Sequence, residues 1–370
     1  MAFLLPRTPW LRQAWEPLTF PNTNFERVPS TETFEEEFRL YKKSQSEDLQ
    51  LENELDAYKR ISEASSEYPG RETVRELLAS FDIIGPDGFH RGMLHRPLWE
   101  CLEAFLYRTP DKRFLAPLLA FVLRRLFLAL EFLHTECKVI HTNINSVNII
   151  FATGDDTVFT AFEEEALEIP CPRKIADGRT IYQSRQHKIP TLGGLPILCD
   201  FGSAEFGDKE HPEVAQPQIY RSPEVILEVP WSYEIDIWNG GCMDLFQGRG
   251  LFTGQDPELQ TYRSRAHPAE IIALLGPPPQ SLLQSGKDSH RFFTEIGFRN
   301  DIPIPERTTL EEQETRLDGR NRHTFLAMMR KILQWDPSKR GSAKELAEDD
   351  WIVKNVGDKE ARQWRLIVES

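Results

Sequence analysis

The first 69 residues of this 370-residue chain contain no glycine, and the first glycine is Gly70. Glycine lets backbone N–H groups approach a bound phosphate closely, so the sequence excludes a glycine-rich phosphate-binding loop from this region. The chain has five cysteines, an odd number, and none of them forms a C-x-x-C pair. We therefore expect neither a disulfide framework nor a zinc site, and we expect a reducing compartment.

The sequence also lacks a long apolar run that is free of charge. Its most apolar stretch, residues 114–133, is interrupted by a proline, two arginines and a glutamate, which favours a buried helix over a membrane span. The net charge of −14 makes nucleic acid and membranes poor partners and attracts basic proteins. We expect a monomer in the cytoplasm or the nucleus. A mitochondrial location is the alternative, because the first 15 residues carry basic side chains and no acid.

The local pattern changes from irregular to helical along the chain. Residues 1–50 contain five prolines and a polar, acidic stretch, and we expect an irregular arm there. Apolar residues at three-residue spacing predict a helix over residues 51–66. Two strands are predicted at residues 77–84 and 91–95, separated by a Pro-Asp-Gly turn. A leucine stripe at helical spacing predicts a long helix over residues 115–133.

The remainder of the chain adds helices and loops. Residues 152–194 are rich in turn signals and carry an acidic run, so we expect mostly loops there. Residues 197–199 form a short apolar strand, and Ser342 with Glu345 predicts a capping box at the start of a late helix. Two small strands early and many helices later indicate an α+β fold, with a small mixed lobe beside a large helical lobe.

Four short motifs follow one another along the chain. The stretch VIHTNINSVN ends at Asn148, DFG begins at Asp200, YRSPE ends at Glu224 and DIW begins at Asp236. They resemble, in turn, the catalytic loop, the metal-binding turn, the end of the activation segment and the start of the central helix of protein kinases. Thr142, together with the Tyr-Arg-Ser sequence, makes the chain most similar to the SR-protein kinases of fungi.

This resemblance implies a two-lobe α+β fold with a truncated small N-terminal lobe and a large, mainly helical C-terminal lobe. On this basis, residues 1–50 form an N-terminal arm, and residues 51–96 keep the bridging helix and two strands of the N-terminal lobe. Residues 97–355 form the C-terminal lobe, and residues 356–370 form a tail.

Members of this family transfer a phosphoryl group from ATP to Ser or Thr of a protein, with the help of Mg²⁺. Asn148 and Asp200 fall at the family's metal-ligand positions, and their side-chain oxygens suit a hard cation. The catalytic aspartate, however, is replaced by Asn143, and the lysine of the loop is replaced by Asn145. An amide cannot usefully accept a proton at neutral pH, so the resemblance implies a degenerate kinase.

The family's nucleotide-binding pair falls on two early residues. Glu54 takes the place of the glutamate that pairs with the phosphate-binding lysine. Counting back from Glu54, the lysine position falls nearest Arg39, with Lys42 as a rival. Arg is not equivalent to Lys here, because its planar fork is longer and wider. The alternative for Glu54 is a solvated charge on the helix surface.

Other matching residues have structural roles in the family. His141 corresponds to the histidine that packs under the D-F-G phenylalanine, and Asp236 to the residue that holds the backbone of the catalytic loop. Glu224 and Arg340 match a buried ion pair that ties the activation segment to the late helices. Thr142 replaces an arginine that clamps a phosphorylated activation segment, so we expect no phosphate-dependent ordering of that segment.

The central helix is shorter than in the family. Met243 and Gly248 lie two residues closer together than the resemblance requires, and two missing residues rotate the following part of a helix by about 200°. Either Phe246 and Leu251 repack, or the helix ends early.

Together, the lost base, the lost loop lysine and the missing phosphate loop predict a pseudokinase that acts as a binding or scaffold module. ATP and Mg²⁺ are the ligands that the resemblance implies, and we expect weak or no nucleotide binding. Acidic residues of the large lobe would hold Arg- and Ser-rich basic proteins. The alternative is an active serine/threonine kinase whose glycine-loop segment is missing from this sequence between Glu37 and Phe38.

Overall fold

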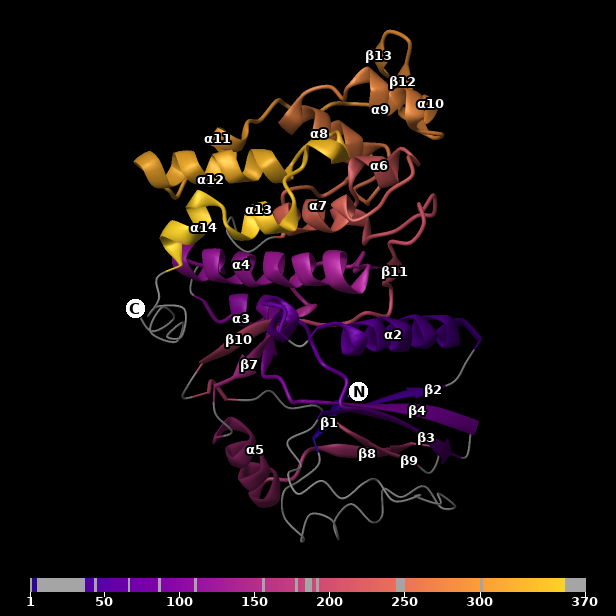
Figure 1. Cartoon of the computed structure of the whole chain (residues 1–370), viewed down its shortest axis with the longest axis vertical. Coiled ribbons are helices and arrows are strands. Elements are labelled where there is room, and N and C mark those ends of the chain that lie inside the picture. The colour runs from indigo at the N-terminus through magenta and orange to yellow at the C-terminus, as the bar shows by residue number, and fades with distance from the viewer. Residues whose placement is uncertain are drawn as a thin grey trace.

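The computed structural model shows two lobes (Figure 1). The lower part of the view contains a sheet below one long helix, together with a shorter helix and a two-stranded hairpin, and the larger lobe above is mainly helical. The α+β fold predicted from the sequence is confirmed. The structure describes residues 2–4, 37–42, 45–65, 67–85, 88–109, 112–154, 157–176, 179–183, 188–190, 193–243, 250–299 and 302–356.

A four-stranded antiparallel sheet forms the base of the smaller lobe. Its strands are β1 (Ala2–Leu4), β2 (Glu37–Lys42), β3 (Ala79–Gly85) and β4 (Gly88–His95), in the order β1-β2-β4-β3. The hairpin of β3 and β4 matches the two predicted strands. The expectation of an irregular arm over residues 1–50 is wrong for β1 and β2, because β2 pairs along its whole length with the distant strand β4.

Helix α2 (Gln45–Glu63) packs one face into the core. Leu51, Ala57, Tyr58 and Ile61 are buried, whereas most of the charged side chains between them face solvent. This is the face that the apolar spacing predicts. The helix begins earlier than predicted, because the polar residues ahead of Leu51 carry no apolar periodicity.

Helix α4 (Ala116–Phe132) lies at the centre of the larger lobe, and 12 of its 17 residues are buried. A helix with apolar residues around most of its circumference belongs inside a core. It continues into one π-helical turn, Leu133–Cys137. Within the described ranges, no helix combines the length and the apolarity needed to cross a bilayer.

Several helices cover α4 on the side away from α2 (Figure 1). They include α7 (Glu234–Cys242), α12 (Gly319–Ile332), α13 (Ala343–Ala347) and α14 (Asp350–Asn355). Helices α13 and α14 make the most extensive contacts with α4. These contacts join the end of the described chain to the middle of the sequence.

Short elements complete the larger lobe, and α13 begins with the predicted capping box, in which Ser342 and Glu345 exchange hydrogen bonds. The remaining short elements are η2 (Arg71–Thr73), α3 (Leu102–Leu106), η4 (Gln218–Tyr220), α6 (Pro223–Ile226), α8 (Ala266–Leu275), α9 (Gln280–Ser285), α10 (Ser289–Phe292), β12 (Phe293–Thr294), β13 (Gly297–Phe298), α11 (Leu310–Gln313) and η5 (Pro337–Lys339).

Short strands position the loops between the two lobes. Strand β7 (Ile149–Thr153) lies between β10 (Gly193–Leu198) and β5 (Glu100–Cys101), and β6 (Val139–Ile140) pairs with β11 (Glu205–Phe206). Strand β10 overlaps the short apolar strand predicted at residues 197–199 and confirms it. Because β7 and β10 are antiparallel, the loop that precedes β7 and the turn that follows β10 meet at one end of the sheet.

The stretch between β7 and β10 is more regular than expected. Within residues 152–194, which were predicted to be mostly loops, the chain forms α5 (Thr157–Glu168), β8 (Arg173–Ala176) and β9 (Arg179–Tyr182). The prolines and glycines of this stretch lie outside the three elements, so they mark the ends of the elements and do not interrupt them. The prediction of a loop-rich stretch is therefore wrong for these three elements.

Helix α7 ends early. Of the two alternatives for its shortened sequence, repacking of a continued helix or an early end, the structure shows the early end. The helix stops at Cys242, and Met243 is already extended. Leu251 packs against the core, whereas Phe246 lies outside the described residues. A cavity of about 70 Å³ remains beside the end of the helix, lined in part by Gly241, Met243 and Leu251.

Candidate active site

Asp236 on α7 fixes the backbone of the loop that follows β6. Its side chain is completely buried, and its two carboxylate oxygens accept hydrogen bonds from the N–H groups of His141 and Thr142, each 2.8 Å long. A third hydrogen bond, 2.9 Å long, joins Oδ2 to Nε2 of His134. Thr142 has a φ of 65°, an unfavourable left-handed conformation that the surrounding bonds hold in place.

His141 is held as a neutral, structural side chain. Its Nδ1 accepts a 3.2 Å hydrogen bond from the N–H of Asn143, and its Nε2 lies 3.0 Å from the carbonyl oxygen of Cys199. Nε2 therefore carries the proton. Burial lowers the pKa of His141, although nearby Asp236 acts in the opposite direction. The ring centroid lies 5.2 Å from that of Phe201, so the packing expected from the resemblance is present.

Three asparagines close this loop on itself. The Nδ2 of Asn145 donates to Oδ1 of Asn143 over 2.9 Å, and the Oδ1 of Asn145 accepts from the N–H groups of Val147 and Asn148. The backbone carbonyl of Asn143 also accepts from Nδ2 of Asn145 and of Asn148. Asn145 thus satisfies groups within the loop and brings no positive charge, and Asn143 presents an amide oxygen that is not a useful base.

Asn148 and Asp200 are brought together by the pairing of β7 with β10. The carbonyl of Asn148 accepts a 2.8 Å hydrogen bond from the N–H of Cys199, the residue before Asp200. Asp200 has a φ of 69°, and its Oδ1 accepts a 3.4 Å bond from the N–H of Gly202. An amide oxygen and a carboxylate are hard donors of the kind that hold Mg²⁺ together with phosphate oxygens.

The donor set at this position is small. Over the described ranges, no group of three His, Cys, Asp or Glu side chains could hold a metal ion. A cation bound by Asn148 and Asp200 would therefore need further ligands, which the phosphates of a nucleotide and water can supply.

Glu54 points from α2 toward the same turn. It is 2% exposed, and its Oε2 lies 3.9 Å from the position that a Cβ atom would take on Gly202. The alternative of a solvated charge is therefore wrong. A buried carboxylate is costly unless a cation pairs with it. Arg39 lies on β2 opposite Met93, and its side chain, like that of Lys42, is outside the described residues.

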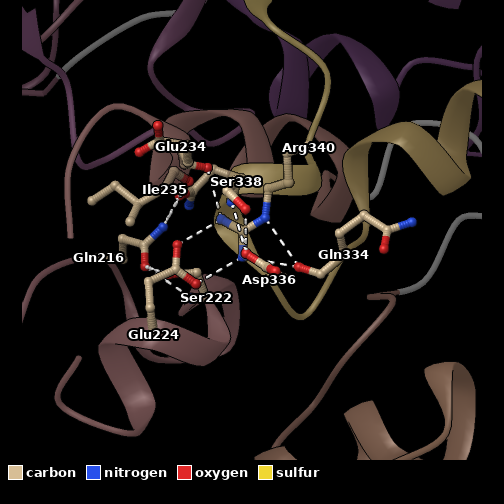
Figure 2. A network of polar contacts seen from close by, with 10 residues as sticks. Gln216, Ser222, Glu224, Glu234, Ile235, Gln334, Asp336, Ser338 and Arg340 are labelled. Carbon is tan, nitrogen blue, oxygen red and sulfur yellow. Dashed lines mark hydrogen bonds and ion pairs between the residues drawn. The ribbon is translucent and has the colours of Figure 1, made fainter. Parts of the chain in front are cut away.

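Arg340 joins the end of the activation segment to α7 and to the late helices (Figure 2). Its guanidinium forms a completely buried ion pair with Glu224. It also donates to the backbone carbonyls of Glu234 and Gln334, and it lies 5.1 Å above the ring centroid of Trp238. The buried ion pair implied by the resemblance is thus formed, and its remaining donors are satisfied.

Gln216 is an anchoring residue that the motifs did not identify. Its Oε1 accepts hydrogen bonds from the N–H and the hydroxyl of Ser222, and its Nε2 donates to the carbonyl of Ile235 (Figure 2). The same Nε2 donates to Asn239 of α7, and Asn239 in turn donates to the carbonyl of Ile144 in the catalytic loop. The sequence signal that could have pointed to this anchor is Asn239, a polar residue among the apolar residues of α7 that needs a hydrogen-bond partner when buried.

The activation segment, residues 203–224, contacts both α2 and the catalytic loop. Arg60 of α2 pairs with Asp208 over 2.6 Å and lies 4.2 Å above the ring centroid of Phe206. The hydrogen bond from Arg60 lowers the pKa of Asp208. At the start of the segment, the hydroxyl of Thr142 donates to the carbonyl of Ser203 over 2.6 Å.

Comparison with known proteins identifies the class of this site. The protein kinase domain family matches residues 98–352, which is more than half of the chain. The chain therefore belongs to the protein kinase family.

Individual relatives are named as serine/threonine or dual specificity kinases. A serine/threonine protein kinase of Aspergillus fumigatus is 37% identical over 311 residues, which cover 82% of this chain and 75% of that protein. The serine/threonine-protein kinase SRPK of Physarum polycephalum is 26% identical over 325 residues, which cover 82% and 76%. Dual specificity protein kinase lkh1 of Schizosaccharomyces pombe is 27% identical over 235 residues, which cover 60% and 30%. These similarities agree with the resemblance to SR-protein kinases.

Proposed function

We propose that this chain is a pseudokinase that serves as a binding or scaffold module for Arg- and Ser-rich basic proteins. The observation that carries the proposal is the closed loop of Asn143, Asn145 and Asn148. Loss of a general base typically slows a reaction about 10²–10⁴-fold, and Asn145 leaves the transferring phosphate without a cation. The hydrogen bonds between these side chains hold the loop in shape without restoring either function.

The charge of the activation segment supports a basic partner. Glu205, Glu210 and Glu213 lie on the segment; Glu205 is partly exposed, and Glu210 and Glu213 are exposed. Guanidinium groups bind carboxylates through charge-assisted hydrogen bonds. With the net charge of −14, these carboxylates favour Arg-rich peptides and disfavour acidic ones.

A nucleotide would find part of its usual site. Asn148 and Asp200 would hold Mg²⁺, which neutralises phosphate charge when it is bound, and buried Glu54 is placed to orient a basic side chain. Residues 1–69 contain no glycine, so they cannot supply the glycine-rich loop that covers the phosphates in protein kinases. Weak binding of ATP fits these residues better than turnover does.

The test combines a transfer assay with a binding assay on the same protein. We expect no transfer from labelled ATP with Mg²⁺ to an Arg-Ser peptide above a blank without protein. In fluorescence anisotropy, we expect the Arg-Ser peptide to bind and a matched Glu-Ser peptide not to bind. Clear turnover would overturn the pseudokinase assignment in favour of an active serine/threonine kinase. Equal binding of both peptides, or of neither, would overturn the assignment of a basic partner.

A further inference from the structure

His211 lies where the activation segment meets the loop that precedes α7. Its side chain is completely buried, and its ring stacks on that of Trp231, with centroids 4.6 Å apart and planes at 19°. The backbones of the two residues exchange hydrogen bonds of 3.3 and 3.0 Å, and Nε1 of Trp231 donates to the carbonyl of Glu213. This contact joins the middle of the segment to the larger lobe.

The hydrogen bonds of the His211 ring determine where its proton lies. Nε2 is 2.9 Å from the carbonyl oxygen of Phe206. A carbonyl oxygen only accepts, so Nε2 carries a hydrogen. Nδ1 is buried and has no hydrogen-bond partner in the described structure. It faces the carboxylates of Glu205 and Glu213, at 3.5 and 3.8 Å.

The neutral and the protonated ring therefore interact differently with the carboxylates of Glu205 and Glu213. In the neutral ring, the lone pair of Nδ1 faces two negative groups, which is unfavourable. In the imidazolium, an N–H faces the same two groups and can form charge-assisted contacts. Glu205 and Glu213 are 38% and 67% exposed, whereas the ring itself has no access to water.

Other charged groups near this contact are directed elsewhere. Asp208 is paired with Arg60, and the side chains of Lys209 and Glu210 are exposed. The side of the ring that faces the loop before α7 is covered by Trp231, which is uncharged. The two carboxylates of the segment are thus the charged groups that face Nδ1.

We propose that protonated His211 clamps the 205–213 stretch of the activation segment together, while its stacking on Trp231 holds that stretch against the loop before α7 in both states, so that the segment is held more tightly in mildly acidic than in alkaline solution. Protonation adds one proton to Nδ1 and forms contacts to Glu205 and Glu213 that join both ends of the 205–213 stretch. Loss of that proton leaves the stacking and the bond to Phe206 but removes both contacts. The order of the segment then depends on pH without any phosphorylation.

Hydrogen exchange followed by mass spectrometry on the full chain tests this clamp without nucleotide or peptide. Exchange at pH 8 and pH 6 is corrected for the intrinsic rate, and residues 205–216 are compared with α4. We expect protection of the segment to increase at the lower pH, because only the imidazolium can form the two contacts to Glu205 and Glu213. We expect no such increase in α4. Equal protection of the segment at both pH values would overturn the proposal.

Two variants separate the clamp from packing. His211→Phe keeps a ring that can stack on Trp231 but has no nitrogen, and we expect its segment to show no increase at pH 6. The double variant Glu205→Gln with Glu213→Gln keeps His211 and removes the facing charges, and we expect it to lose the increase as well. If His211→Phe does not fold, the surface glutamine variant still decides the question. An undiminished pH response in either variant would show that the clamp is not at His211.

Discussion

The guanidinium of Arg340 and the carboxylate of Glu224 form two parallel hydrogen bonds, 2.6 and 2.7 Å long, across 116 positions of the chain. Both side chains are fully buried. Taking two charges out of water is costly, and their mutual attraction offsets this cost only when the pair is complete. The pair therefore fixes how the activation segment meets α7 and the late helices.

Breaking this pair should strongly destabilise the larger lobe. We expect Glu224→Gln to lower the free energy of unfolding by about 3–5 kcal/mol, because Arg340 would remain buried without its counter-charge. Urea unfolding followed by circular dichroism measures this change. Glu234→Gln is the matched control, since Glu234 contacts Arg340 only through its backbone carbonyl. A loss below about 1 kcal/mol in Glu224→Gln, typical of a surface pair, would contradict the prediction.

Restoring both charges of the catalytic loop should raise phosphoryl transfer. We expect the double variant Asn143→Asp with Asn145→Lys to increase the rate of transfer to an Arg-Ser peptide by up to about 10²–10⁴-fold over the unmodified chain. The rate is measured with labelled ATP and Mg²⁺. Adding Asp200→Asn to the double variant should abolish the gain, because the metal position is then lost. An absent gain in a variant that still binds ATP would place the main defect in the smaller lobe.

Nucleotide should stabilise the chain only slightly. With ATP and Mg²⁺ present at or below their dissociation constant, linkage limits the stabilisation to about 0.4 kcal/mol. A thermal-shift titration measures this effect, and Mn²⁺ replaces Mg²⁺ in a parallel series. We expect Asp200→Asn to remove any shift that depends on the metal. A large shift that saturates at micromolar ATP would reveal a competent nucleotide site and contradict this expectation.

Acid should destabilise the fold through its buried neutral histidines. Burial lowers the pKa of His267 to about 3, and it also lowers the pKa of His141. Below an unfolded pKa of about 6.5, the unfolded chain binds protons that the folded chain does not, so stability falls with pH by about 1.4 kcal/mol per unit for each group. For His267, this loss continues down to about pH 3.

A variant can assign part of this pH dependence. We expect His267→Gln to reduce the slope of unfolding free energy against pH between pH 6 and pH 4, measured by urea unfolding at several pH values. His290, whose side chain is exposed, supplies the matched control His290→Gln, which should leave the slope unchanged. Identical slopes in His267→Gln and the unmodified chain would refute the assignment. This global loss at low pH is opposite in sign to the local gain proposed for the activation segment.

Local sequence patterns predicted the elements that bury a continuous apolar face. The leucine stripe predicted α4, and the apolar spacing of Leu55, Tyr58 and Ile61 lies within α2. Strand β2 was not predicted, because its partner β4 lies about fifty residues further along the chain and no local signal identifies that partner. The burial of Glu54 was open for the same reason, since a charge on a helix is usually solvated and only the arrangement of both lobes encloses it.

The sequence by itself determined the chemistry that is missing: an amide stands at Asn143, another at Asn145, and no glycine occurs before Gly70. These are properties of residue type and need no coordinates. The tertiary structure alone decided that Asn145 turns inward to close the loop, that α7 stops at Cys242, and that Gln216 and His211 anchor the activation segment. A side chain's partners come from contacts between distant parts of the chain, whereas its acidity and charge come with the residue itself.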